Sequence, residues 1–209
     1  MNHSKKLDVR YLTQMGVLVA IEVVMKLIGL GSVPVGPLYM SFLTVPIAVG
    51  AIILGPAAGA ILGGVFGFVS FMDAVKGASI MTSNLLAVSP LHTFMLCFVM
   101  RVLMGFCVGW VYRAISGVCG RSVVNCFVAS LSAPVLNTVF FMGYIVLAFY
   151  QTDYVQGLVA AKGAVNPLMF IVLLVGIQGV IEAVVCSVAG TAVSGSLIRA
   201  MGGMKTAKR

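Results

Sequence analysis

Long apolar runs separated by short polar or glycine- and proline-rich segments dominate the chain. The apolar runs cover residues 11–30, 38–54, 56–72, 91–112, 123–150 and 167–197. A helix needs about 20 mainly apolar residues to cross the hydrocarbon core of a bilayer. The pattern therefore predicts an all-α integral membrane protein with six transmembrane helices, forming a single membrane domain over residues 1–209.

The segments between these runs differ in length and polarity. Residues 31–37 contain two prolines and two glycines and are expected to form a turn. Residues 73–90 and 151–166 are longer and carry several polar side chains. Connections of this length are often functional, so both are predicted to be functional loops.

Composition agrees with a membrane protein. Hydrophobic residues make up 61% of the chain and charged residues 9%, against about 45–50% and about 25% in soluble domains. The net charge of +8 does not indicate nucleic-acid binding, because the basic residues lie mainly in short segments between apolar runs and form no single face. The lipid bilayer is the expected surrounding, and no nucleic acid is expected as a partner.

The distribution of basic residues predicts the orientation. If six spans are counted, Lys76 and Lys162 fall on one side of the membrane. Nine others fall on the opposite side: Lys5, Lys6, Arg10, Arg113, Arg121, Arg199, Lys205, Lys208 and Arg209. Cytoplasmic loops carry the excess of lysine and arginine, so both termini are predicted to be cytoplasmic and loops 73–90 and 151–166 to face outward.

Glycine recurs every four residues in the third apolar run, at Gly55, Gly59, Gly63 and Gly67. On a helix these residues form one stripe, and small residues let a second helix approach closely. Two interpretations stay open at this point. The stripe packs against a neighbouring helix of the same chain, or it docks on a separate subunit.

Charged residues interrupt three of the apolar runs, with Glu182 in the last of them. Glu22 and Lys26 lie four residues apart in the first run and can pair along one helix face. Alternatively, one of them faces a ligand or a partner. Arg101 lies deep in the fourth run and needs a partner, because a buried arginine costs several kcal/mol in a membrane.

Arg101 shares its predicted depth with two amides. At 1.5 Å per residue, Arg101, Asn137 and Gln178 lie roughly 15, 19 and 16 Å below the outer ends of their helices. This layer suits a small polar ligand with an anionic group, for which Arg101 would provide the fork that binds a carboxylate. The alternative is a buried structural pair between Arg101 and Glu182.

Three residues nearer the outer surface complete the candidate substrate-binding set. Asn84 lies in the polar segment 73–90 and His92 follows Pro90 at a helix entrance, where it also suits a hydrogen-bonded helix-end residue. Tyr144 can stack on a ligand or anchor its helix at the membrane interface, and the second role is the more common one.

Signatures of catalysis and of metal binding are missing. The sequence has no Gly-x-x-x-x-Gly-Lys-Ser/Thr loop, no His-Glu-x-x-His and no Gly-x-Ser-x-Gly. The five cysteines show no Cys-x-x-Cys spacing. The chain is therefore predicted not to be an enzyme, to bind neither metal nor cofactor, and not to hydrolyse ATP itself.

Several fragments together carry a family resemblance. They are Leu54-Gly55-Pro56-Ala57-Ala58-Gly59-Ala60, Arg101-Val102-Leu103-Met104-Gly105, Gly109-Trp110-Val111-Tyr112-Arg113 and Pro134-Val135-Leu136-Asn137-Thr138. Over residues 12–197 the chain resembles the substrate-binding S components of energy-coupling factor (ECF) vitamin transporters.

The resemblance implies a six-helix protein in the plasma membrane of a prokaryote, whose outer half captures a vitamin. It also implies that the first three helices engage a coupling membrane subunit driven by two ATPases. Where family members often carry Ala-x-x-x-Ala on the first helix, this chain has Gly16-x-x-x-Ala20. The expected docking residues are Gly16, Ala20, Gly55, Gly59, Gly63 and Gly67.

Among the branches of the family, the Gly-Pro turn and the arginine-led fourth span look closest to pantothenate transporters, and a carboxylate ligand would suit Arg101. Folate-type members share much of the pattern and remain the alternative. A self-contained secondary transporter or channel is a second alternative. It would require an internal repeat, which is not evident, and an ion relay, for which the candidates are Glu22 and Glu182.

Overall fold

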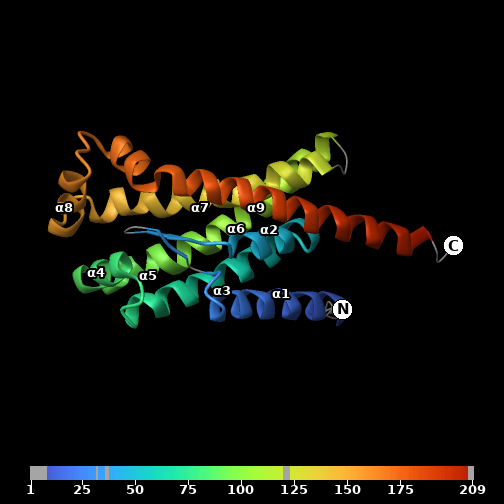
Figure 1. The fold of residues 1–209 in the computed structure, drawn as a ribbon. Helices are drawn as coiled ribbons and strands as arrows, with labels where there is room; N and C mark the ends of the chain where they lie inside the picture. Colours follow the sequence, from blue (N-terminus) through green and yellow to red (C-terminus); the bar gives the residue numbers. More distant parts are fainter. Residues whose placement is uncertain (1–8, 32, 36–37, 120–122, 207–209) are drawn as a thin grey trace, which may run out of the picture.

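The computed structural model describes residues 9–31, 33–35, 38–119 and 123–206. Most of these residues are helical, and the long helices lie side by side in an elongated bundle (Figure 1). In chain order the elements are α1 (Val9–Leu27), β1 (Val33–Val35), β2 (Leu38–Met40), α2 (Thr44–Ile53), α3 (Pro56–Val75), α4 (Ile80–Val88), α5 (Pro90–Phe94), the π-helical turn η1 (Met95–Val99), α6 (Met100–Cys119), α7 (Val123–Phe149), α8 (Asp153–Ala161) and α9 (Pro167–Thr206).

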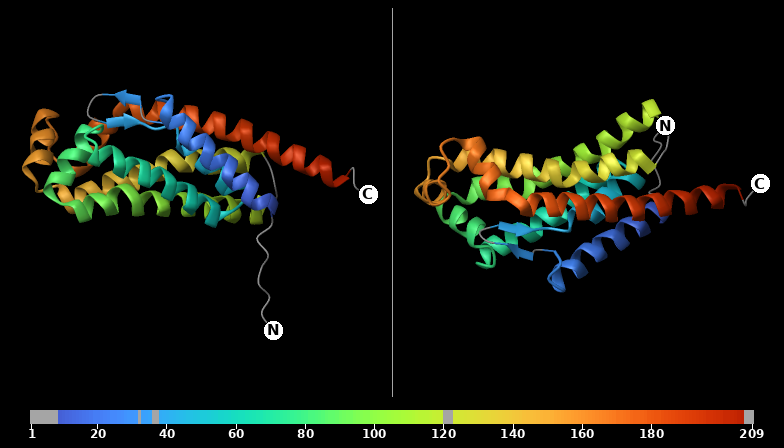
Figure 2. Two further views of the ribbon diagram at one scale, coloured as in Figure 1. Left: turned by 90° about the horizontal axis from the view of Figure 1, so that it is seen from below. Right: turned by 45° about the horizontal axis from the view of Figure 1, so that its top comes forward.

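The two ends of the bundle differ. The short helices α4 and α8 lie at one end, and the described ends of α1 and α9 lie at the other, as the views in Figures 1 and 2 agree. The segments predicted as polar loops, 73–90 and 151–166, thus each contain a short helix and share one end. Of the basic residues used to predict orientation, Lys5, Lys6, Arg121, Lys208 and Arg209 lie outside the described residues.

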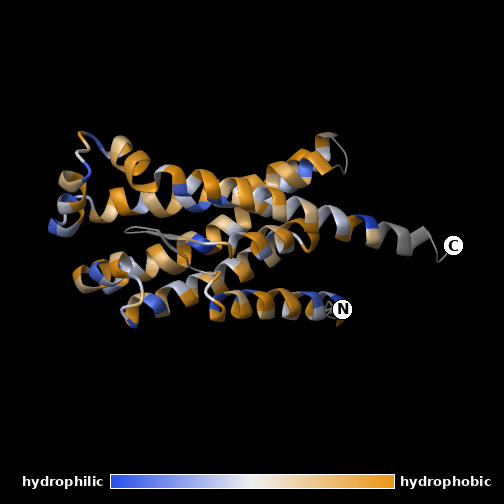
Figure 3. Ribbon diagram, in the orientation of Figure 1, coloured by the Kyte–Doolittle hydropathy of each residue, from blue (hydrophilic) through white to orange (hydrophobic). Residues whose placement is uncertain are grey.

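Four helical stretches in the described part of the chain are long and apolar enough to cross a membrane: Pro56–Val75, Pro90–Val118, Val123–Phe149 and Pro167–Ala200. Figure 3 shows apolar residues along these helices and many of the hydrophilic ones near the two ends. At 1.5 Å per residue, the ten residues of α2 extend about 15 Å, half of the roughly 30 Å hydrocarbon core. The count of six spans therefore stays a prediction.

The helix predicted over 38–54 is wrong in its first part. Residues Leu38–Met40 instead pair antiparallel with Val33–Val35, with Val33 opposite Met40, and the helix begins only at Thr44. Hydropathy averages do not separate a short strand from a helix. The available signal was Val33 and Val35 before Gly36-Pro37 and Tyr39 after it, since β-branched and aromatic residues around a glycine- and proline-containing turn are typical of a hairpin.

Prolines mark where several helices begin. Pro56, Pro90 and Pro167 each open a helix, a position where the missing N–H costs nothing. Gly55 precedes α3 with φ of 101°, a left-handed conformation that favours glycine. This turn reverses the chain between α2 and α3 and sets α3 beside α2.

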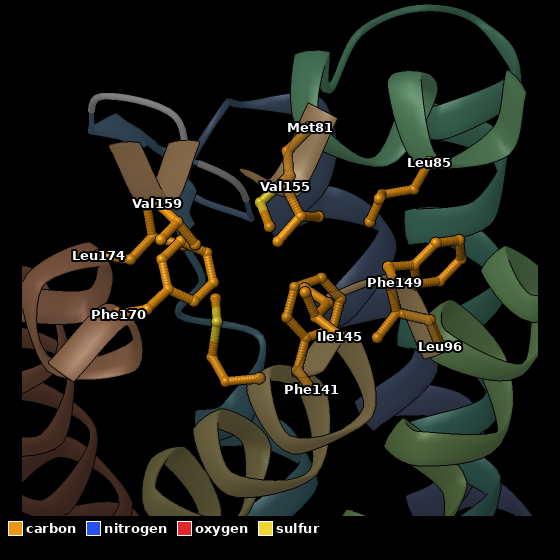
Figure 4. Close-up of a cluster of buried hydrophobic side chains, with 11 residues drawn as sticks. Met81, Leu85, Leu96, Phe141, Ile145, Phe149, Val155, Val159, Phe170 and Leu174 are labelled. Atoms are coloured by element: carbon orange, nitrogen blue, oxygen red, sulfur yellow. The ribbon is translucent and has the colours of Figure 1, made fainter. Parts of the chain in front are cut away.

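The interior contains two main apolar clusters, one towards each end. Figure 4 shows the first, in which side chains of α4, η1, α7, α8 and α9 converge. Its largest fully buried members include Phe149 and Phe170. The second cluster joins α1, α2, α3, α6 and α7 around Leu43, Ile47 and Leu62.

The glycine stripe of α3 packs within the chain. A Cβ at Gly59 would meet the carbonyl oxygen of Gly105, and one at Gly63 would meet that of Arg101. A Cβ at Gly67 would lie 2.7 Å from the carbonyl oxygen of Cys97. All three glycines are buried against α6 and η1, so the prediction that they dock on a separate subunit is wrong.

The other predicted docking residues are placed differently. A Cβ at Gly55 would lie 3.0 Å from Nη2 of Arg113 on α6, so this glycine also faces its own chain. Gly16 and Ala20 are exposed on α1, and a Cβ at Gly16 would meet nothing within 4 Å. Of the six predicted docking residues, Gly16 and Ala20 are the two that lie on an exposed surface in the described structure.

Candidate functional site: a polar cavity between the two core clusters

A cavity of about 300 Å³ lies between the two apolar clusters. Its apolar wall includes Phe66 of the second cluster and Met81, Phe141 and Met142 of the first. Its polar wall combines charged, amide and hydroxyl side chains: Lys26, Ser41, Ser70, Asp73, Ser79, Thr82, Arg101, Asn137, Thr138, Gln178 and Glu182. Small-molecule sites generally combine an apolar wall with convergent polar groups, and this cavity has both, with polar residues in the majority.

Arg101 is the cation held deepest in this site. It follows the π-helical turn η1 at the start of α6, a kind of distortion that is frequent at functional sites. Its side chain is 6% exposed, and Nη1 donates a hydrogen bond of 2.9 Å to the carbonyl oxygen of Leu96. The guanidinium carbon lies 4.9 Å from the ring centroid of Phe66 and 4.3 Å from that of Phe141.

These contacts fix the orientation of the guanidinium without using all its donors. Two aromatic faces attract the cation, and one carbonyl accepts from it. Nε has no hydrogen-bond partner in the described structure. A desolvated N–H without an acceptor is costly, so Nε of Arg101 is left as a donor that a further acceptor would stabilise.

The depth argument placed three residues together, and all three line this cavity. Arg101 comes from α6, Asn137 from α7 and Gln178 from α9. Counting residues from helix ends thus identified side chains that meet in space although they are far apart in the sequence. Their contact with a substrate stays a prediction.

A break in α9 precedes the residues that this helix contributes. Gly176 has φ of 47° and ψ of −140°, so the helical path is interrupted within the apolar run. Gln178, Gly179 and Glu182 follow within two turns and all line the cavity. Glycine is suited to this left-handed backbone, which a side chain would strain.

The three outer candidates are not among the described residues that line the cavity. Asn84 donates from Nδ2 to the carbonyl oxygen of Ile80 on its own helix, at 2.9 Å. His92 Nδ1 is hydrogen-bonded to Ser89 Oγ at 2.9 Å, which agrees with its interpretation as a helix-end residue. Tyr144 lies beside His92, with ring centroids 6.4 Å apart.

The predicted pair between Glu22 and Lys26 is wrong. Lys26 Nζ instead donates to Asp73 Oδ2 at 2.5 Å, joining α1 to α3, and both residues line the cavity. Glu22 is 2% exposed, and its carboxylate oxygens have no hydrogen-bond partner among the described residues. The long-range pair could have been found from depth, because Lys26 and Asp73 both lie near the outer ends of their predicted spans.

The alternative pair between Arg101 and Glu182 also has a clear outcome. Both side chains line the cavity, yet the described structure contains no ion pair between them within 4.0 Å. Glu182 Oε2 accepts a hydrogen bond of 3.4 Å from the backbone N–H of Ser41. The two side chains therefore line one cavity without contacting each other as an ion pair.

Comparison with known proteins identifies one family. A family model described as "ECF transporter, substrate-specific component" matches residues 10–193, a range that contains the whole described cavity lining from Lys26 to Glu182. The search of curated proteins gives no match.

Proposed function

Because the chain belongs to the family of ECF transporter substrate-specific components, we propose that its cavity captures a small anionic vitamin, with pantothenate favoured. Members of this family are transport subunits rather than enzymes, and they work with a membrane coupling subunit and ATPases. The chain is accordingly a multi-pass membrane protein that binds a small substrate.

The observation that carries this proposal is the environment of Arg101. Its guanidinium is 6% exposed, held between two aromatic rings and left with an unpaired Nε beside a cavity. Guanidinium matches the planar geometry of a carboxylate. In a desolvated site a charge-assisted hydrogen bond is about twice as strong as a neutral one, so a carboxylate would stabilise this arginine.

Cavity size favours pantothenate over folate. Ligand sites generally range from about 300 to 1,000 Å³, and this cavity is about 300 Å³. Pantothenate is a short, flexible acid with one amide and two hydroxyl groups, whereas folate joins a bicyclic ring, a benzoyl group and a glutamate. The smaller molecule suits the volume, and its amide and hydroxyls suit Asn137 and Gln178.

The proposed orientation places both termini in the cytoplasm and α4 and α8 outside. The basic residues Arg10, Arg113 and Arg199 belong to the helix ends remote from α4 and α8, whereas Lys76 and Lys162 adjoin those two helices. The positive-inside rule assigns the first group to the cytoplasm. Substrate would then enter from the outer end of the bundle.

The proposed docking surface for the coupling subunit is the exposed face of α1 that carries Gly16 and Ala20. Helices associate in lipid through close packing, for which small residues four apart are suited. Both residues are exposed, and space lies open beyond Gly16. This assignment replaces the stripe of α3, which is already buried.

Mass spectrometry of the small molecules that co-purify with the protein tests the proposal. The protein would be purified from cells supplied with isotope-labelled pantothenate, and the extract compared with that of an Arg101→Ala protein. Labelled pantothenate in the wild-type extract and its loss from the variant are expected. A different molecule in the wild-type extract would reject pantothenate, and an uncharged one would reject the role of Arg101.

A further inference from the structure

Glu182 presents a second incompletely hydrogen-bonded polar group to the cavity. Its side chain is 6% exposed, and Oε1 has no hydrogen-bond partner among the described residues. Oε2 has only the long 3.4 Å contact from the N–H of Ser41 among the described hydrogen bonds. A buried carboxylate with one oxygen unpaired is costly, unless a group that is absent from the isolated chain completes its hydrogen bonding.

The cations that line the cavity do not supply that group. Arg101 donates to Leu96 and contacts two aromatic rings, and it forms no ion pair with Glu182 in the described structure. The ammonium of Lys26 is engaged by Asp73 at 2.5 Å. The cavity is therefore lined by two residues with an unpaired polar atom. One is the acceptor Oε1 of Glu182 on α9, and the other is the donor Nε of Arg101 on α6.

We propose that Glu182 is a second substrate anchor, which accepts a hydrogen bond from an N–H or O–H of the bound molecule while Arg101 binds its anionic group. This inference rests on the proposed function and narrows the substrate class to molecules that carry both groups. An analogue without the donor leaves Oε1 buried and unpaired. Sites built in this way discriminate strongly against such analogues.

Binding of radiolabelled pantothenate to the purified protein in lipid nanodiscs tests the proposal. Glu182→Gln removes the charge and keeps the shape, so a charge-assisted hydrogen bond becomes a neutral one and affinity should fall about tenfold. Glu22→Gln is the matched control. Glu22 is equally a buried carboxylate without described partners, but it lies outside the described cavity lining, so affinity should not change.

Two analogues separate substrate contact from a structural role. One is pantothenate with both hydroxyls methylated, and the other is pantothenate with its amide nitrogen methylated. For the analogue that lacks the donor used by Glu182, the substitution Glu182→Gln should cost no further affinity. An equal loss for pantothenate and both analogues, or no loss for any of them, would overturn the proposal.

The wild-type protein and the Glu182→Gln and Glu22→Gln variants also separate a failure of this proposal from a wrong choice of vitamin. If the wild-type protein binds no pantothenate but retains another molecule that mass spectrometry identifies, pantothenate is rejected and the retained molecule becomes the probe. Its loss from Glu182→Gln but not from Glu22→Gln would support the anchor. Equal retention by both variants would overturn it, and a wild-type protein that binds no small molecule would contradict both proposals.

Discussion

Replacing Gly63 by leucine should destabilise the isolated protein, because Gly63 packs on the backbone of α6. A Cβ at this position would meet the carbonyl oxygen of Arg101 and lie 2.9 Å from its carbonyl carbon and 3.3 Å from Val102 Cα. Backbone atoms cannot move aside as a flexible side chain can, so α3 and α6 would have to separate.

The magnitude follows from the contact. Inserting carbons into a packed interior costs about 1–3 kcal/mol, and more where backbones collide. For a chain of this size each kcal/mol lowers the melting temperature by roughly 2–4 °C, so we expect a decrease of several degrees. The shift should also weaken pantothenate binding, because the displaced backbone carries Arg101 itself.

Thermal unfolding of the purified protein in detergent, followed by circular dichroism, measures the effect. Gly16→Leu is the matched control, since a Cβ there meets nothing within 4 Å and leucine is the better helix former. The control should melt at or above the wild-type temperature. A Gly63→Leu protein that melts like the wild type and binds pantothenate normally would refute the packing of α3 on α6.

Two further predictions concern the whole transporter. Gly16→Leu and Ala20→Leu should prevent co-purification of the coupling subunit, because a bulky side chain holds two helices apart in lipid. The isolated variants should still bind pantothenate normally. An intact complex would contradict docking on this face. In a background without native cysteines, a cysteine at Lys162 should react with an impermeant maleimide in whole cells and one at Lys205 only after permeabilisation. The reverse pattern would invert the topology.

The sequence indicates well how deep a residue lies along its helix, but it indicates poorly which neighbouring helix that residue faces. Residue counts along the apolar runs placed Arg101, Asn137 and Gln178 in one layer, and all three line the cavity. The same periodicity did not show which neighbour a helix face meets. The stripe through Gly63 therefore allows both an internal and an external partner from the sequence, and in the structure α6 of the same chain covers it.

Local pairing rules also failed where long-range contacts compete with them. Glu22 and Lys26 have the spacing of a helical ion pair, but Asp73 on α3 binds Lys26. The unpaired oxygen of Glu182 likewise becomes visible only when the surrounding helices are placed. Such competition between near and distant partners depends on tertiary packing.

Pantothenate binding by Arg101 variants tests the central claim most directly. Titration of the purified wild-type protein, Arg101→Lys and Arg101→Ala would be compared with Arg113→Lys, a control outside the described cavity lining. Lysine keeps the charge but loses the planar fork, so Arg101→Lys should weaken binding by on the order of 1–3 kcal/mol, or roughly 5- to 150-fold. Arg113→Lys should bind as the wild type does. A folded Arg101→Ala protein with unchanged affinity for pantothenate would contradict the account.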